Sequence, residues 1–440
     1  MKTLKQVFGI SIVLLLMGGL LNTSQAQLKK ELQYYRPIDQ SGTYMFMPNK
    51  QDMGASFNGI KLYAGVGLTS QWQNLNESTA GINPSSDQNY NLTPIGSGFN
   101  LPTANLYLDA QMAEGIRLHL TSYLSSRHHN ETYVKGGYLR VDALKMLGSD
   151  AIDNLMQYIT IKVGDMESNY GDAHFLRSDN ANTIYNPLVG NYLLDSFTTM
   201  DGAELYVFNS GMIAMFGYAG GMAAERPTVE KPDKRRPIIY GKLGYDSKIG
   251  DNMRFRLTGS LLHSNRFTDL YSGDRSGSRY YNIMADGLDG YGRGGSGDAW
   301  SGRVKPGFNN GFTSFMINPY LKMGAFNLFG IIESSKEMKT DHNVQQYSIE
   351  GQYFLTKSVY IAGRYNYVKG YLAAAGLPGD VTPVNSEKVN RVQIGGGWYL
   401  TKNILAKLEY VSQNYNNFPV NSVYDDGKFH GLMVEAAIGL

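Results

Sequence analysis

The stretch Ile60-Lys-Leu-Tyr-Ala-Gly-Val-Gly-Leu68 alternates between apolar and other residues. Its even-numbered residues are all aliphatic, whereas its odd-numbered positions hold Lys61, Tyr63 and glycines. Successive side chains of a β-strand point to opposite faces, so this pattern predicts a strand with one apolar face. A strand that crosses a lipid bilayer obliquely needs about 9–11 residues. The stretch is therefore predicted to be a strand of the length that crosses a membrane.

The same alternation recurs in segments of similar length as far as the C-terminus. We count about 16 segments, and bacterial outer-membrane barrels generally have an even number of strands. The sequence thus predicts an all-β fold, a transmembrane antiparallel β-barrel of about 16 strands. The predicted strands span residues 60–68, 103–113, 115–127, 131–145, 158–168, 201–210, 212–223, 236–248, 252–265, 311–323, 325–337, 344–355, 358–370, 388–401, 403–416 and 427–440.

The connections between these strands differ in length according to their order. Joins from an even-numbered strand to the next are mostly short, as in Ala113-Glu-Gly115 and Asn209-Ser-Gly211, whereas joins from odd-numbered strands are often long. Short periplasmic turns and long extracellular loops are typical of outer-membrane barrels. One short-side join, at about 146–157, is longer, and Ser149 is expected to cap a short helix there. The long loops are 75–102, 169–200, 224–235, 266–310, 371–387 and 417–426.

The N-terminus has the features of a secretory signal peptide. Lys2 and Lys5 precede an apolar stretch from Val7 to about Leu21, and Ser24-Gln-Ala26 supplies the small residues of a cleavage site. We expect this leader to be removed and the protein to reach the outer membrane of a Gram-negative type of cell. A membrane anchor is disfavoured because the apolar core is short for a span of roughly 20 residues. The expected divisions are 1–26 as signal peptide, 27–58 as a periplasmic lead-in and 59–440 as the barrel.

Composition excludes several classes of function. The chain has no cysteine, which excludes a lipid-modified N-terminal cysteine, disulfide bonds and thiolate chemistry. The formal net charge is +2, which gives no support for nucleic-acid binding. The sequence contains neither a phosphate-binding loop nor a metal-ligand spacing, so no cofactor, no metal site and no catalytic residue is predicted. The expected partners are outer-membrane lipid and small hydrophilic solutes.

If the apolar register faces lipid, the opposite register faces the barrel lumen. That register carries about twice as many basic as acidic residues, and rings of Arg and Lys attract anions. We therefore predict a porin that passes small solutes, with a mild preference for anions or a binding site for a phosphorylated or carboxylated solute. Equally favoured is the alternative that these cations pair with Asp109, Asp142 and Glu409 and hold the wall in register. The basic residues predicted to line the pore are Arg117, Arg140, Lys162, Arg254, Arg256, Arg364 and Arg391.

The loop at 169–200 is the most unusual of the long connections. It mixes charges, amides and aromatic residues with few aliphatic ones. Following the fifth strand, it is well placed to fold into the lumen and narrow it, and hydrogen-bonding groups at such a constriction set selectivity. The alternative is that its polar residues tie the loop to the wall. The candidates for lining the constriction are Asp172, His174, Arg177, Asp179 and Asn180.

The same loop resembles a sequence block of Bacteroidetes porin-like outer-membrane proteins. Two hairpins with a Leu-Thr-Lys turn, at 352–365 and 397–410, are similar to those of the broader phosphate-selective porin O/P group. The resemblance implies a porin of about 16 strands, usually a homotrimer in the broader group. That group's phosphate-binding arginines are not carried over, because no residue-by-residue match is found. The block consists of Gly164-Asp165, Asn169-Tyr-Gly-Asp-Ala-His-Phe175, Arg177-Ser-Asp-Asn-Ala-Asn182 and Tyr185-Asn-Pro-Leu-Val-Gly-Asn-Tyr192.

Two further classes of function stay open at this point. One is a non-conducting barrel that forms part of a larger surface complex. The other, less favoured, is an outer-membrane hydrolase, which would need a histidine with Asp or Ser partners. His119, His174 and His263 are the candidates for such a base, and no spacing in the sequence singles one out.

Overall fold

The computed structural model describes the chain from Leu32 to Leu440 with gaps. The predicted signal peptide at 1–26 and the predicted loop at 224–235 lie outside the described residues. Within them, we find no helix that is both long and apolar enough to cross a membrane. The described residues are 32–47, 50, 53–83, 86–92, 94–124, 132–220, 237–265, 270–271, 279–284, 302–306, 308, 310–373 and 385–440.

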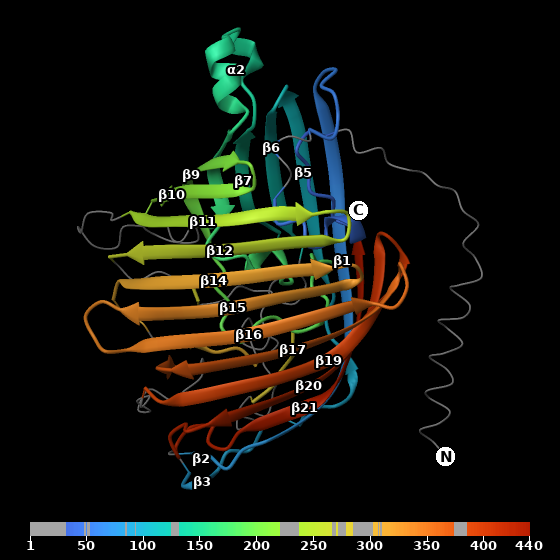
Figure 1. Cartoon of the computed structure of the whole chain (residues 1–440). Helices are drawn as coiled ribbons and strands as arrows, with labels where there is room; N and C mark the ends of the chain where they lie inside the picture. Colours follow the sequence, from blue (N-terminus) through green and yellow to red (C-terminus); the bar gives the residue numbers. More distant parts are fainter. Residues whose placement is uncertain are drawn as a thin grey trace. The chain divides into compact units, whose positions relative to one another are not determined.

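Sixteen strands of the described chain form a closed antiparallel β-barrel, which confirms the predicted fold class. Each strand pairs with the next along the chain, and the last pairs with the first, from Gly67 opposite Gly439 to Ser78 opposite Lys428. Figure 1 shows β11 to β21 lying side by side along the wall. The strands are β1 (Lys61–Ser78), β5 (Thr103–Ala113), β6 (Ile116–Tyr123), β7 (Tyr133–Val141), β8 (Ile159–Glu167), β9 (Thr199–Asn209), β10 (Met212–Ala219), β11 (Ile238–Ile249), β12 (Met253–Ser264), β14 (Phe312–Met323), β15 (Phe326–Glu337), β16 (Asn343–Phe354), β17 (Val359–Gly370), β19 (Glu387–Thr401), β20 (Ile404–Asn416) and β21 (Lys428–Gly439).

The outward-facing side chains of the wall are largely apolar. Leu62, Leu243 and Ile394 are 71%, 70% and 61% exposed, and they belong to three different strands. Leaving large apolar side chains in water costs about 25 cal/mol for each Å² of apolar surface. The wall therefore presents to its surroundings the surface that a lipid bilayer accommodates.

Strand β1 is longer than the sequence predicts. It continues to Ser78, whereas the predicted segment ends at Leu68. Beyond Leu68 the side chains that turn away from the lumen are mostly polar, as at Ser70 and Asn74. An apolar–polar alternation appears only where a strand's outer face is in lipid, so it marks the crossing portion of β1 and misses its polar extension.

The turns between strands follow the predicted asymmetry. Ser210 and Gly211, with φ angles of 49° and 86°, join β9 to β10, and positive φ at both central residues matches the tight hairpin turn. The one long turn on this rim contains α2 (Asp150–Met156), which confirms the predicted helix (Figure 1). Ser149 is its N-cap residue, although its side chain makes no capping hydrogen bond. The short elements are η1 (Gln40–Gly42), β2 (Ile82–Asn83), β3 (Gln88–Asn89), β4 (Gly98–Phe99), η2 (Lys145–Leu147), η3 (Ala173–Phe175), β13 (Lys305–Pro306) and β18 (Leu372–Ala373).

Much of the lumen is filled by the connection between β8 and β9. We call residues 168–198 the lumen segment. Its residues Val189, Tyr192 and Leu193 are fully buried. The segment reaches strands far from β8 in the barrel order, because the Leu193 amide donates to Asn366 on β17 at 2.6 Å. The barrel core is therefore the contact between this segment and the inward-facing side chains.

Residues 32–47 pack against the same interior. The Gln33 amide donates to the Gln111 side chain of β5 at 3.0 Å, and Phe46 is fully buried. Gln40 lies beside two turns of the short-turn rim. Its backbone amide donates to the Lys402 carbonyl at 2.8 Å, and its side-chain amide donates to the Lys357 carbonyl at 2.7 Å. These contacts place residues 32–47 inside the barrel at the rim that carries the short turns.

Candidate functional site

A cavity of about 260 Å³ lies inside the barrel, between the wall and the segments that fill the lumen. Its wall side is formed by β5 to β9. Its other sides are formed by the lumen segment and by residues 35–47. The lining includes six cations (Arg36, Arg117, Lys135, Arg140, Lys162 and Arg177) and four carboxylates (Asp109, Asp165, Glu167 and Asp179).

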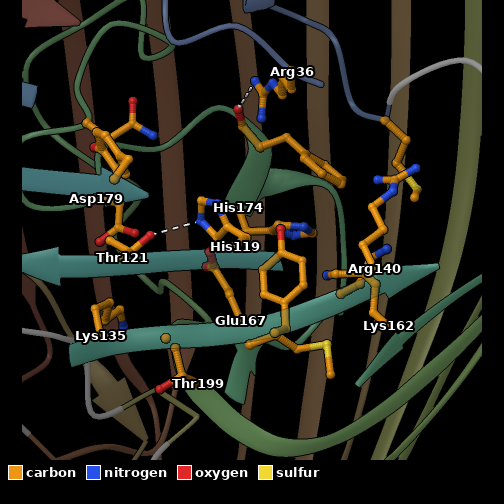
Figure 2. Close-up of a pocket in the computed structure, with 18 of the residues that line it drawn as sticks. Arg36, His119, Thr121, Lys135, Arg140, Lys162, Glu167, His174, Asp179 and Thr199 are labelled. Atoms are coloured by element: carbon orange, nitrogen blue, oxygen red, sulfur yellow. Dashed lines mark hydrogen bonds between the residues drawn. The ribbon is translucent and has the colours of Figure 1, made fainter. Parts of the chain in front are cut away.

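Three of these cations form a row across adjacent strands. Arg117 on β6 lies opposite Arg140 on β7, and Arg140 lies opposite Lys162 on β8. We call these three residues the cation row. Like charges directly opposite each other destabilise a sheet. Such a row persists only where nearby anions compensate it, and it concentrates positive charge on one side of the cavity, where Figure 2 shows Arg140 and Lys162 together.

Each member of the row has a carboxylate partner on the wall. Arg117 binds Asp109, Arg140 Nε lies 2.6 Å from Asp142, and Lys162 Nζ lies 3.2 Å from Glu204. The carboxylates are more deeply buried than the cations. The side chain of Lys162 is 14% exposed, whereas that of Glu204 is 0% exposed. Asp109 borders the cavity together with the three cations, whereas Asp142 and Glu204, the partners of Arg140 and Lys162, do not.

The other end of the cavity has the opposite arrangement. Lys162 lies nearer the short-turn end of β8, and Glu167 ends the strand on the long-loop side. Glu167 binds Arg177, and here the carboxylate side chain is 23% exposed while the guanidinium side chain is 0% exposed. Arg177 and Lys135 both lie 3.5 Å from the ring centroid of Phe197, a cation–π contact that holds the two cations against the lumen segment.

Local irregularities bring three of these groups into the cavity. A register shift between β6 and β7 leaves Lys135 as an extra residue, so both Lys135 and Gly136 line the cavity. Gly164 on β8 has a φ of 136°, while the register of β8 with its neighbours β7 and β9 continues unbroken there. Asp165 and Glu167 then both line the cavity. The sequence-based set of lining residues omits all three charged groups, although a glycine inside a strand is a signal for such a bulge.

The twelve predicted lining residues divide into two groups. Those that border the cavity are Arg117, Arg140, Lys162, His174, Arg177 and Asp179. Figure 2 shows Asp179 on the side opposite Arg140 and Lys162. Those that do not border it are Asp172, Asn180, Arg254, Arg256, Arg364 and Arg391.

The second group fixes the lumen segment or the wall. Arg364 Nη1 donates to the Gly190 carbonyl at 2.7 Å, and Arg391 Nη1 donates to the Asn191 carbonyl at 2.7 Å. Asn180 donates to the Ala104 carbonyl of β5 at 3.0 Å. Arg254 lies nearer the short-turn end of β12, where its Nη1 donates to the Tyr44 carbonyl at 3.0 Å. These contacts tie irregular backbone inside the barrel to its wall.

Asp172 and His174 illustrate how the lumen segment is held. Arg256 Nε donates to Asp172 at 2.8 Å, and Lys242 Nζ lies 2.7 Å from the same carboxylate. Burial alone would raise the pKa of Asp172, but these two cations hold it well below its usual range. Burial and the nearby Lys242 charge hold the pKa of His174 well below its usual range, so this imidazole is neutral.

His119 is fixed between two neighbours on the cavity wall. Its Nδ1 lies 2.9 Å from Asp109, and its Nε2 lies 2.9 Å from the Thr121 hydroxyl (Figure 2). Both contacts are short enough to be hydrogen bonds. The contacts with Asp109 and Thr121 orient the imidazole ring, and the Thr121 side chain borders the cavity. Of the three histidines considered as bases, His119 and His174 lie at this cavity and His263 does not.

Comparisons with known proteins bear on the fold. No protein-family model matches the chain, and no curated protein matches its sequence. Among solved structures, a loop-deletion mutant of OmpT, an outer membrane protein of Vibrio cholerae, matches with a TM-score of 0.50 at 10% identity, over 87% of this chain and 100% of that one. An anion-selective porin from Comamonas acidovorans matches with a TM-score of 0.50 at 11% identity, over 87% and 100%.

A third solved structure, OprB of Pseudomonas putida, matches with a TM-score of 0.50 at 8% identity, over 87% of this chain and 94% of that one. At such low identities the likeness shows the fold alone. The chain therefore shares the β-barrel fold of outer-membrane proteins, porins among them.

Proposed function

We propose that the protein is an outer-membrane porin through which small hydrophilic solutes diffuse passively, anions more readily than cations. The observation that carries this proposal is the cation row, whose three positive groups border the cavity while two of their three carboxylate partners, Asp142 and Glu204, do not. Positive groups along a narrow passage attract anions and repel cations. The apolar outer face and the barrel fold support a position in the outer membrane.

The cavity favours a narrow passage over a wide water-filled one. Pockets for drug-sized ligands are about 300–1,000 Å³, and this cavity is smaller. A solute in it is close to both the wall and the lumen segment. Charged groups on the lining then act at short range, where they discriminate between solutes more strongly than in bulk water. We therefore propose a selective channel for small solutes, with outer-membrane lipid around it and no enzymatic step.

The test is conductance in planar lipid bilayers with purified, refolded protein. The proposal expects stepwise currents in KCl and, in a salt gradient, a reversal potential with the sign of chloride preference. A reversal potential of the opposite sign refutes the anion preference. If no stepwise currents appear in a preparation that circular dichroism shows to be folded, the porin proposal is refuted.

A sealed barrel that serves in a surface complex is the second candidate. The observation in its favour is the dense filling of the described lumen, where residues such as Tyr280 reach inward and donate to Glu409 at 2.6 Å. For this second candidate we expect no conductance in bilayers, and we expect a partner protein to co-purify with the barrel in a fixed ratio. A homotrimer stays a prediction, and cross-linking of the protein in native membranes tests it.

A further inference from the structure

We infer that the cavity selects solutes that carry opposite charges at their two ends, of which zwitterionic peptides of two or three residues are the simplest class. The inference rests on the proposed function, since a solute must enter the cavity from one of the barrel mouths. It goes further than anion preference, because it assigns a separate role to the carboxylates at the other end of the cavity.

The first observation is that the ion pairs are reversed between the two ends of the cavity. At the cation row, all three cations are more exposed than their carboxylate partners, with Arg117 at 7% against 0% for Asp109. At the Glu167 end the carboxylate is the more exposed partner, at 23% against 0% for Arg177. A solute in the cavity therefore meets positive groups at one end and negative groups at the other.

The second observation is that further carboxylates border the cavity at the Glu167 end. At the Glu167 end, Asp165 and Asp179 are half-buried and border the cavity, and the cation Lys135, which is 7% exposed, borders it with them. Coulomb interactions are much stronger in such a confined space than in bulk water. Each end can therefore bind a charged group of the solute.

The spacing between the ends sets the length of the solute. Lys162 and Asp165 lie three positions apart on β8, and a strand rises about 3.3 Å per residue, so their Cα atoms are about 10 Å apart. An extended peptide adds about 3.3–3.6 Å per residue, so the charged ends of a di- or tripeptide are separated by roughly 6–10 Å. A single amino acid is too short to reach both ends with its two charges.

Between the charged ends, the lining suits a peptide chain. Tyr138 and Phe175 are half-buried and face the cavity from β7 and the lumen segment. The Thr121 hydroxyl and the His119 imidazole lie on the same wall. Aromatic faces contact the apolar parts of a small peptide, and hydroxyl and imidazole groups hydrogen-bond with its amides. Neither contact requires a particular side chain, so we expect selection by charge and length more than by sequence.

The test is calorimetric binding of three peptides to the detergent-solubilised, full-length barrel. Triglycine carries both charges, N-acetyl-triglycine only the carboxylate, and triglycine amide only the ammonium group. A charge contact of ordinary strength corresponds to about a fivefold change in Kd, so we expect triglycine to bind about fivefold more tightly than either capped form. Equal affinity of triglycine and its N-acetyl form overturns the inference and leaves a simple anion site. An undetectable affinity for all three peptides also overturns it.

Two substitutions locate the effect. Asp165→Asn and Glu167→Gln are each expected to reduce the affinity for triglycine toward that of the N-acetyl form, whereas N-acetyl-triglycine itself should bind no more weakly. The matched control is Asp201→Asn, because Asp201 lies on the neighbouring strand β9, its side chain is exposed and it does not border the cavity. If both cavity variants leave triglycine binding unchanged, the inference is wrong.

Bilayer currents separate this inference from the proposed function. If triglycine reduces the conductance no more than its capped forms do, the inference is contradicted and the porin proposal stands. If triglycine binds selectively in detergent but no conductance is seen, the porin proposal fails and the inference stands. The cavity then binds solutes with two opposite charges in a barrel that does not conduct.

Discussion

Two sets of inward-facing cations on the same barrel wall have different surroundings. The cation row on β6 to β8 faces the cavity and pairs with carboxylates of the wall itself. On the other side, Arg364, Arg391 and Lys407 project from β17, β19 and β20 into the lumen segment. We call these three the anchoring cations. They are 2%, 0% and 2% exposed, so no solute reaches them.

The partners of the anchoring cations explain the difference. Lys407 Nζ donates to the carbonyls of Thr183 and Leu188 at 2.7 and 3.1 Å, and Arg364 and Arg391 also donate to backbone carbonyls of the lumen segment. Buried irregular backbone must find hydrogen-bond partners, since an unpaired carbonyl costs free energy. A cation on the inward register thus lines a passage or stabilises a filling segment, according to what lies opposite it.

The largest expected effect is that of Arg364→Met. This change leaves the buried Glu350 carboxylate without Arg364, whose Nε lies 2.7 Å from it. It also removes the shortest of three hydrogen bonds to the Gly190 carbonyl. The remaining partners of Glu350 are tyrosine hydroxyls at 3.4 and 3.5 Å. Breaking a buried ion pair on one side typically costs about 3–5 kcal/mol. We expect a loss of that size in urea unfolding of the refolded protein, with faster hydrogen exchange at residues 186–194.

The control for this prediction is the double variant Arg364→Met with Glu350→Met. Replacing a buried ion pair by apolar residues of similar volume is often nearly neutral. The double variant should therefore recover much of the lost free energy of unfolding. If the single variant unfolds at the same urea concentration as the unchanged protein, Arg364 does not anchor the lumen segment.

A smaller effect is expected from pH, through His174 in the lumen segment. Burial and Lys242 lower the pKa of this imidazole in the folded protein, whereas the unfolded value is about 6.5. Below about pH 6.5 the unfolded chain therefore binds a proton that the folded chain does not, and stability falls as pH falls. Between pH 7.5 and 5 we expect His174 to account for a loss of about 1–2 kcal/mol. His174→Asn should reduce the slope of unfolding free energy against pH, and an unchanged slope would exclude this role.

The sequence predicts the wall well, because lipid imposes the pattern that the sequence displays. Outside lipid the signal disappears, as the polar outward positions Ser70 and Asn74 of β1 illustrate. The filling of the lumen is harder to predict. An inward-facing arginine such as Arg364 has the same sequence pattern whether it faces water or the Gly190 carbonyl, because the alternation reports the side of the wall and not what lies opposite.

The candidate site is predictable in part. Its cation row follows from strand alternation alone, since Arg117, Arg140 and Lys162 occupy regular inward positions. Lys135 and Asp165 do not, because one lies at a register shift and the other follows Gly164, whose φ is positive. A prediction from strict alternation along the strand assigns the side chains beyond such an irregularity to the wrong face of the sheet. Of the carboxylates at the negative end of the cavity, the sequence therefore predicts Asp179 and does not predict Asp165 or Glu167.

The smallest structural effect is expected from Lys162→Gln, which makes the comparison between the two sets of cations sharper. Glu204, the partner of Lys162, keeps a bond from the Tyr240 hydroxyl at 3.0 Å and one from the Asn169 amide at 3.0 Å. Its carboxylate is therefore not left without donors, unlike that of Glu350 in Arg364→Met. We expect a change of less than about 1 kcal/mol in the free energy of unfolding.

The same substitution should alter permeation, because it removes one positive group from the cavity while Glu204 keeps its negative charge. We expect the anion-to-cation permeability ratio, measured from reversal potentials, to fall on the order of twofold. Arg391→Gln is the matched substitution among the anchoring cations, which no solute reaches. It should cost more stability, because the Asn191 carbonyl loses the Arg391 donor and the Gly302 carbonyl is left with the Gln413 side chain at 3.1 Å. The opposite ranking, with Lys162→Gln the more destabilising and Arg391→Gln the greater change in selectivity, would mean that the two sets have exchanged roles.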